Sequence, residues 1–385
     1  MERVVFGLIL MLLLTGMLLS AFIIQPAKAE WTGTVYIRAD GSIDPPYAPI
    51  ITYDNITYTL TDNITSSADG IVVERDNIVI DGAGYTLEGT GAEGSKGIDL
   101  SGRRNVTVQN TRIKNFCYGI WLAYSSNNSV SGNNVANNWS GIGLSGSSNN
   151  NIGRNHIANN YYGIWLSSSS NNIIYHNNFI NNSVQAKGYS QSANTWDDGY
   201  PSGGNYWSDY VGVDLFSGPY QSETGSDGVG DAAHEIYADN RDRYPLMAPF
   251  NTFDAGTWNG TAYNVDVVSN STVSNFQLNT AQRTMSFNVT GVEGTAVFCR
   301  ITIPNIIVEE LWHGNYTVLL NGEPWPYRNW TDTANTYIYL NYTHSEHQIV
   351  IIPEFPSAII PPIFMTFSIL AIIFTRKRFP KNFKT

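Results

Sequence analysis

The chain has 385 residues and a formal net charge of −11, with 21 Lys and Arg residues against 32 Asp and Glu residues. This acidic balance argues against a nucleic-acid-binding protein, because contacts to phosphate need clustered basic side chains. The 2 cysteines, Cys117 and Cys299, exclude a disulfide framework and are expected to be free, buried thiols. Stability must therefore come from packing.

The first 29 residues are typical of a secretory signal peptide. Arg3 precedes an apolar run from Val4 to Leu19, and Ala27-Lys28-Ala29 has the small-x-small form of a cleavage site. Cleavage there would make Glu30 the first residue of the mature protein, and an uncleaved anchor is the alternative. Both interpretations predict an exported chain.

Residues 30–70 contain two β-prone runs, Val35–Ile37 and Ile56–Leu60. A solenoid has unpaired backbone at its first coil, which a terminal segment must cover, so we expect these residues to form an N-terminal cap. Irregular coils follow, beginning at Gly70 and Asn77. The next Gly-Ile pair comes only at Gly97, so a loop near residues 89–95 should protrude.

A 22-residue repeat begins at Gly97 and defines a predicted solenoid over residues 71–193. Gly97-Ile98-Asp99-Leu100 returns in similar form at Gly119, Gly141 and Gly163. Helical repeats need about 33 to 47 residues, whereas 22 residues suit three short strands separated by turns. We therefore predict triangular coils that stack into three parallel sheets, with the Ile and Leu of each tetrapeptide pointing inward.

Asparagine recurs in the same register at the expected turns. One column contains Asn105, Asn127, Asn149 and Asn171, and a second contains Asn115, Asn137, Asn159 and Asn181. Asn tolerates the left-handed backbone of a tight turn, and stacked side-chain amides can bond one another from coil to coil. We predict such ladders at the corners, with ligand binding as the alternative role.

This pattern resembles the right-handed parallel β-helix of the carbohydrate-binding and sugar-hydrolase repeat families, in particular the NosD-type β-helix. The resemblance covers roughly Ile71 to Leu246. It implies the fold strongly and the activity weakly, because one fold hosts many functions.

Residues 194–248 break the register and are rich in Gly, Asp and aromatic residues, as are the stretches that close NosD-type helices. They contain Asp227-Gly228-Val229-Gly230-Asp231, with Glu223 and Asp239 nearby. Alternating carboxylates and glycines suit a hard cation, so calcium at these four acidic residues is one hypothesis. A solvated acidic loop is the other, since the full EF-hand pattern is absent.

Residues 249–353 form a predicted β-sandwich that would separate the helix from the membrane. Short alternating runs with turn signals between them are typical of this fold. The predicted strands are Ala262–Val268, Met285–Val289, Ala296–Ile303, Tyr316–Leu320, Tyr337–Tyr342 and Gln348–Ile352.

Residues 354–385 are predicted to tether the protein to the membrane. Ile359–Phe374 carries no charge, and the basic tail from Arg376 onward indicates a cytoplasmic end. Pro353-Glu354-Phe355-Pro356 resembles the sorting signal that archaeosortases process in archaeal surface proteins. A processing enzyme of that class is therefore a possible partner, and a plain stop-transfer anchor is the alternative.

Asn-x-Ser/Thr sequons are frequent, and on an exported chain they predict N-linked glycans. They lie at Asn55, Asn63, Asn105, Asn127, Asn138, Asn181, Asn259, Asn270, Asn288, Asn315, Asn329 and Asn341.

Outward-facing aromatic residues are the best candidates for ligand binding. Trp121 and Trp165 share one column, and Tyr118 and Tyr162 share another. Neighbours that face inward place Trp121 on the outer surface of its strand. Aromatic faces stack on the C–H faces of sugars and contribute strongly to binding. Packing against a neighbouring loop or subunit is the alternative.

Catalytic groups are scarce, because no Asp or Glu occurs from Leu100 to Trp196. A β-helix lyase, epimerase or glycosidase would have to use Asp81, Asp99, Asp197 or Asp198 at the ends of that stretch. A copper-accessory role like that of NosD is a third class, for which His156, His176, His344 and His347 are the available ligands.

These observations together predict a membrane-tethered protein on the extracellular face of the cell. We expect it to bind a surface polysaccharide or glycoprotein, or to act in adhesion or envelope structure, without catalysis.

Overall fold

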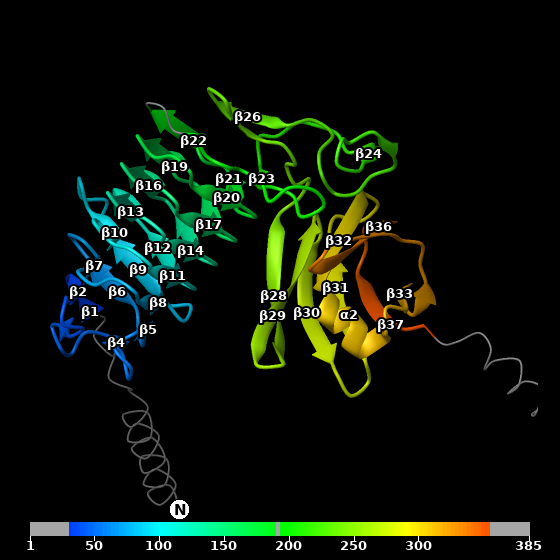
Figure 1. Cartoon of the computed structure of the whole chain (residues 1–385), viewed down its shortest axis with the longest axis horizontal. Helices are drawn as coiled ribbons and strands as arrows, with labels where there is room; N and C mark the ends of the chain where they lie inside the picture. The colour runs from blue at the N-terminus through cyan, green and yellow to red at the C-terminus, as the bar shows by residue number, and fades with distance from the viewer. Residues whose placement is uncertain (1–30, 190–192, 355–385) are drawn as a thin grey trace, which may run out of the picture.

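The structure is a computed structural model, and it describes residues 31–189 and 193–354 (Figure 1). These residues form a solenoid of stacked β-coils, a closing segment and a pair of antiparallel sheets. The predicted signal peptide and the predicted membrane segment after Glu354 lie outside them. Within the described ranges, no helix is long and apolar enough to cross a membrane.

Three long sheets run along the solenoid, and each coil contributes one strand to each sheet (Figure 1). Sheet A contains, in spatial order, β1 (Trp31–Thr32), β6 (Ile64–Ser66), β9 (Thr86–Gly89), β12 (Arg112–Lys114), β15 (Asn134–Ala136), β18 (His156–Ala158), β21 (Asn178–Ile180) and β23 (Tyr206–Trp207). Sheet B contains β3 (Ile43–Asp44), β2 (Val35–Ile37), β7 (Ile71–Val73), β10 (Lys96–Asp99), β13 (Tyr118–Ala123), β16 (Ser140–Ser145), β19 (Tyr162–Ser167) and β22 (Val184–Tyr189). Sheet C contains β4 (Ile50–Ile51), β5 (Thr57–Leu60), β8 (Val79–Asp81), β11 (Thr107–Gln109), β14 (Ser129–Ser131), β17 (Asn151–Gly153) and β20 (Ile173–Tyr175).

The predicted inward columns form the core of the solenoid. Ile120 pairs in register with Ile142, and Ile142 with Ile164, and all three side chains are fully buried. The Leu column beside them is buried in the same way. The prediction of stacked parallel coils with these residues inside is confirmed.

The asparagine ladders are present, but they use different columns from those predicted. Buried amides bond from coil to coil at about 3 Å in three ladders, and the predicted Asn127 and Asn149 instead hold exposed left-handed turn positions. At the two predicted corners the prediction was wrong by one residue because most coils have two adjacent asparagines there with different roles, and the third ladder was not predicted. The ladders are Asn128–Asn150–Asn172–Asn194, Asn133–Asn155–Asn177–Asn205 and Asn138–Asn160–Asn182. Of the predicted columns, Asn105 donates to Asn77 at 2.9 Å.

The N-terminal end of the solenoid is covered by two antiparallel pairs. Strand β3 pairs with β2 at the end of sheet B, and β4 pairs with β5 at the end of sheet C. Both end strands have 2 residues, which limits the unpaired edge that they present. Residues 31–70 therefore combine a first coil with its cover.

The other end is closed by Trp196 and Trp207, which are buried against the last coils. Both indoles pack on each other, with ring centroids 5.8 Å apart. Asp242 is buried below them and accepts hydrogen bonds from the indole of Trp207 and the backbone of Asn205. The closing segment also contains two short hairpins, β24 (Phe216–Ser217) with β25 (Glu223–Thr224) and β26 (His234–Tyr237) with β27 (Asn240–Asp242).

Two five-stranded antiparallel sheets follow and enclose one apolar core, which is the arrangement of a sandwich. All six strands predicted from the sequence are present, whereas the outer strands and a helix, α2 (Asn305–Trp312), were not predicted. One sheet has the order β28 (Phe250–Trp258), β29 (Thr261–Ser269), β32 (Ala296–Pro304), β36 (Asn335–Thr343) and β35 (Arg328–Thr331). The other has the order β30 (Thr272–Asn279), β31 (Thr284–Thr290), β37 (His347–Pro353), β33 (Tyr316–Leu320) and β34 (Glu323–Pro324). Both cysteines are free, with Cys299 buried and Cys117 half-buried.

The β28–β29 hairpin of the sandwich lies next to the solenoid (Figure 1), and specific side-chain contacts hold the two parts together. The side chain of Asn178 on β21 donates to the carbonyl of Phe250 at 2.8 Å and accepts from its N–H at 2.7 Å. Arg154 forms an ion pair of 3.2 Å with the buried Asp266 on β29. These contacts place the β28–β29 hairpin beside the corner between sheets C and A.

Candidate functional site

Seven aromatic side chains form a continuous strip on the outer surface of sheet B, across strands β13, β16, β19 and β22. Each ring has its centroid within 6.5 Å of another ring of the set. We call this surface the aromatic strip, and it consists of Tyr118, Trp121, Trp139, Tyr161, Tyr162, Trp165 and Tyr189. All four ligand-binding residues predicted from the sequence belong to it.

The alternation of the strands places Trp121 and Trp165 outside, because their neighbours Ile and Leu face the core. Gly143 stands between them in the same column. A Cβ atom at Gly143 would lie 2.6 Å from the Trp121 ring, so only glycine lets that indole lie over the next strand. The two indoles stack with centroids 5.8 Å apart and an interplanar angle of 24°.

Trp139 and Tyr161 extend the strip from the turns that precede β16 and β19. Their rings stack with centroids 6.5 Å apart, and their exposed fractions are 42% and 51%. Trp139 also meets Tyr118 and Tyr162 edge-on at 5.4 and 5.2 Å. The sequence analysis missed both residues, although their 22-residue spacing was a usable signal.

The tyrosines give the strip polar groups beside its apolar faces. The hydroxyls of Tyr162 and Tyr189 are 3.5 Å apart. This contact raises the pKa of Tyr162 to about 12. Like any protonated tyrosine hydroxyl, it can donate as well as accept a hydrogen bond. The strip therefore combines aromatic stacking surfaces with hydroxyl groups, and both kinds of group can bind a sugar.

A pocket of about 570 Å³ adjoins the strip at Tyr118 and Trp139. Its other wall is the protruding loop between β9 and β10, including Gly91, Glu93 and Gly94. This is the loop that the irregular spacing before Gly97 predicted. The loop therefore forms a wall at one end of the aromatic strip.

The four carboxylates considered for catalysis are not brought together. Asp99 lies next to Trp121 in register, but its carboxylate is 3.1 Å from the amine of Lys96 and accepts from Ser101. Asp81 is on sheet C, where it accepts from the side chain of Gln109. Asp197 and Asp198 lie in the closing segment, where Asp197 is buried and paired with Arg243. The structure does not form a carboxylate pair at the strip from these residues.

Carboxylates of the acidic loop accept hydrogen bonds from backbone N–H groups of the closing segment. Asp227 accepts from the N–H of Val229, and Asp231 accepts from the N–H groups of Leu215 and Phe216. Asp214, which the sequence analysis missed, accepts from the N–H groups of Asp227 and Gly228. Glu223 and Asp239 are exposed on separate hairpins. Among the described residues there is no group of three or more His, Cys, Asp or Glu side chains that could hold a metal, and calcium at this loop stays a prediction.

The loop predicts a pH dependence of stability. Burial raises the pKa of Asp214 to about 7, and the neighbouring Asp227 and Asp231 act in the same direction. A raised carboxyl pKa contributes stability that is complete below about pH 4 and is lost as the pH rises through 7. The melting temperature of the wild type should therefore fall between pH 5 and pH 8. In Asp214→Asn the melting temperature should change less with pH in thermal scans, and an unchanged pH dependence would contradict this assignment.

Calcium that raises the melting temperature at pH 8, reversibly with chelator, would indicate an ion in this loop.

The four histidines considered for copper lie in different environments. His176 is buried and stacks on Phe250 with centroids 4.2 Å apart, and burial lowers its pKa to about 3. His156 lies on β18, while His344 bonds Ser271 and Thr295 within the sandwich. His347 bonds Ser345. None of these positions gathers a set of copper ligands.

Most sequon asparagines are exposed on turns or strands and are accessible to modification. Asn63 and Asn288 are half-buried, and Asn138 differs because it is 4% exposed. Its amide donates to Asn160 and to the carbonyl of Ala136, as a rung of a buried ladder. A glycan at Asn138 would have to displace that rung. The exposed sequon residues are Asn55, Asn105, Asn127, Asn181, Asn259, Asn270, Asn315, Asn329 and Asn341.

Comparison with known proteins supports the fold. Residues 32–212 match the sequence model of the family described as periplasmic copper-binding protein (NosD). That match and the stacked coils together support a NosD-type parallel β-helix. No curated protein matches the chain.

Two solved structures were also found. The Dettilon tailspike protein gp208 is 11% identical, with a TM-score of 0.21, over 75% of this chain and 68% of that one. The tailspike protein gp49 of Acinetobacter baumannii bacteriophage Fri1, a capsular polysaccharide depolymerase, is 12% identical, with a TM-score of 0.14, over 75% and 69%. At such TM-scores neither likeness carries an argument.

Proposed function

We propose that this chain is an exported surface protein that binds a polysaccharide on its aromatic strip and does not cleave it. The observation that carries the proposal is the unbroken contact between seven outward-facing rings. Large exposed apolar surfaces of this kind mark interaction sites, and flat rings suit the C–H faces of sugars.

The orientation of the strip favours an extended ligand. The rings follow one another from coil to coil, at about 4.8 Å per coil along the solenoid axis. A saccharide chain running in the same direction would meet a ring at successive units. The tyrosine hydroxyls beside the rings would bond its hydroxyl groups, and the pocket at Tyr118 and Trp139 would receive a branch or a chain end.

The absence of cleavage rests on the placement of the carboxylates. Sugar hydrolysis needs two carboxyl groups across one bond, about 5 to 9.5 Å apart. The nearest of the four candidates, Asp99, is neutralised by Lys96, and the other three lie on other faces of the molecule. Export is supported by the signal-like first 29 residues and by the periplasmic description of the matching family.

Single substitutions in the strip test the proposal. Trp121→Ala and Trp165→Ala in the full-length protein should each weaken polysaccharide binding by roughly 1 kcal/mol or more, because each removes a stacking surface. Binding would be found on a glycan array and quantified by calorimetry. Tyr124→Ala is the matched control, since Tyr124 is an exposed ring at the edge of the same sheet but makes no ring contact with the strip.

Two results would count against the proposal. Equal binding by wild type and both Trp variants would remove the strip from recognition. Release of unsaturated or reducing sugars by wild type, abolished by substitution of Asp81, Asp99, Asp197 or Asp198, would show an enzyme of the β-helix type instead.

A further inference from the structure

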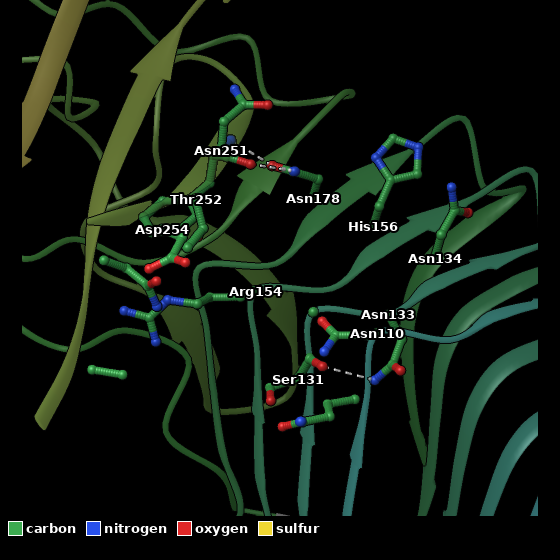
Figure 2. Close-up of a pocket in the computed structure, with 15 residues that line it drawn as sticks. Asn110, Ser131, Asn133, Asn134, Arg154, His156, Asn178, Asn251, Thr252 and Asp254 are labelled. Atoms are coloured by element: carbon green, nitrogen blue, oxygen red, sulfur yellow. Dashed lines mark hydrogen bonds between the residues drawn. The ribbon is translucent and has the colours of Figure 1, made fainter. Parts of the chain in front are cut away.

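A polar groove lies between the solenoid and the β28–β29 hairpin, at the corner between sheets C and A (Figure 2). This corner is the one that sheet B does not share, so the groove and the aromatic strip are on different faces. Its volume is about 780 Å³. Ser131, Asn134 and His156 line it from the solenoid, and Asn251, Thr252 and Asp254 line it from the hairpin.

The groove continues along the solenoid axis. A second cavity of about 560 Å³ shares Asn110, Gly132 and Asn134 with the first and extends to Asp81 and Gly84. The two cavities together cross several successive coils. A channel with this direction suits a chain molecule better than a compact ligand.

The floor of the groove presents unused hydrogen-bonding groups at the spacing of the coils. Asn134 and His156 are partners in register on β15 and β18, and Figure 2 shows them on neighbouring strands. Within the described residues, the side chains of Asn134, His156 and Asn264 make no hydrogen bond, whereas most of the other amides of the solenoid corner are held in ladders. An amide and a neutral imidazole each offer a donor and an acceptor, which match the hydroxyl groups of a sugar.

The charges of the groove favour a neutral ligand. Arg154 is paired with Asp266 at 3.2 Å, and burial lowers the pKa of His156, which favours the neutral form of that ring. Asp254 adds an exposed carboxylate on the hairpin side. A polyanion would therefore meet two carboxylates, Asp254 and, in the second cavity, Asp81, against one exposed guanidinium that makes no ion pair within the described residues, that of Arg112.

We propose that this groove is a second carbohydrate site, which binds a neutral oligosaccharide along the solenoid axis through hydrogen bonds rather than ring stacking. This second proposal depends on the proposed function only for the class of ligand. The groove itself shares no residue with the aromatic strip. With sites on two faces, one molecule can connect two polysaccharide chains.

The test uses the full-length protein with neutral hexasaccharides of glucose, mannose and N-acetylglucosamine, and with hexagalacturonate as the acidic probe. The background is the strip variant Trp121→Ala/Trp165→Ala, so that binding to the strip does not mask the groove. In this background a neutral hexasaccharide should still bind. Adding Asn134→Ala and His156→Ala should weaken that binding about tenfold, the effect of losing two hydrogen bonds. Neither side chain has a structural hydrogen bond, so folding should be unaffected.

Two further variants sharpen the test. Asn264→Trp would fill the groove from β29 and should also weaken binding about tenfold or more, by excluding the ligand. Asn151→Ala removes an exposed amide of sheet C outside the groove and should leave binding unchanged.

The proposal is overturned if the groove variants bind the neutral probes as tightly as their background, if hexagalacturonate alone binds, or if the background binds no probe. Failure of the strip proposal is separate, because it appears as unchanged affinity when Trp121 and Trp165 alone are substituted.

Discussion

Ile142→Asp is expected to destroy the cooperative stability of the solenoid. Ile142 is fully buried and is stacked between Ile120 and Ile164. The substitution removes apolar packing and leaves an unpaired carboxylate, or its protonated form, without a partner in the core. Together these effects should lower the free energy of unfolding by about 5 kcal/mol or more, which is a large part of the stability of a domain.

Chemical denaturation followed by circular dichroism measures this effect. Ser145→Asp on the same strand is the control, because Ser145 faces outward and a carboxylate there stays hydrated. It should change the stability by less than about 1 kcal/mol. A variant Ile142→Asp that keeps the thermal stability of the wild type would refute the inward orientation of this column.

Asn155→Ala should be a costly substitution in the ladders. The Asn155 amide donates to the carbonyl of Val130 at 2.8 Å and to the side chain of Asn177 at 2.9 Å. Its oxygen accepts from both the backbone and the side chain of Asn133. Alanine would leave these buried partners unsatisfied, at about 1–3 kcal/mol for each group. We expect a total loss of about 3–5 kcal/mol, because a water molecule in the vacated space could satisfy some of them.

Asn149→Gly is the control, because it shows how much stability is lost when a corner residue outside the ladders is substituted. Asn149 is exposed and has a φ of 59°, a conformation that glycine adopts readily. Its substitution should change the free energy of unfolding by less than about 1 kcal/mol. Similar losses for the two variants in denaturant titrations would contradict the different roles assigned to the two columns.

The core of the solenoid could be predicted from the sequence because it repeats. A residue such as Ile142 recurs every 22 positions, and strict alternation within each strand determines that it faces inward. The same logic placed Trp121 outside. The strands of the sandwich were predictable for a similar reason, since their apolar residues alternate.

The corners could not be predicted as well, because alternation ends where the chain turns. Asn127 and Asn128 are both asparagines, yet one is an exposed left-handed residue and the other a buried rung. Only the backbone direction at the turn decides between them. Trp139 lies in such a turn, which is why its membership of the aromatic strip was missed.

The polar groove lay beyond sequence reasoning for a different reason. It exists because Arg154 meets Asp266 and Asn178 meets Phe250, across 112 and 72 residues of chain. Nothing local in the sequence shows how a solenoid and a sandwich will lie against each other. Asn134 therefore looks like any other polar residue of the repeat until the hairpin is in place.

The identical register of the coils also sets how the length of this molecule can change during evolution. Gain or loss of 22 residues adds or removes one layer, while a shift by one residue would turn every inward side chain outward. Removal of the layer from Gly141 to Tyr162 is the exception. It would replace Gly143 by Trp165 in the stack, and Trp121 would have to leave the strand over which it lies. Loss of one layer is thus not permitted between the two indoles.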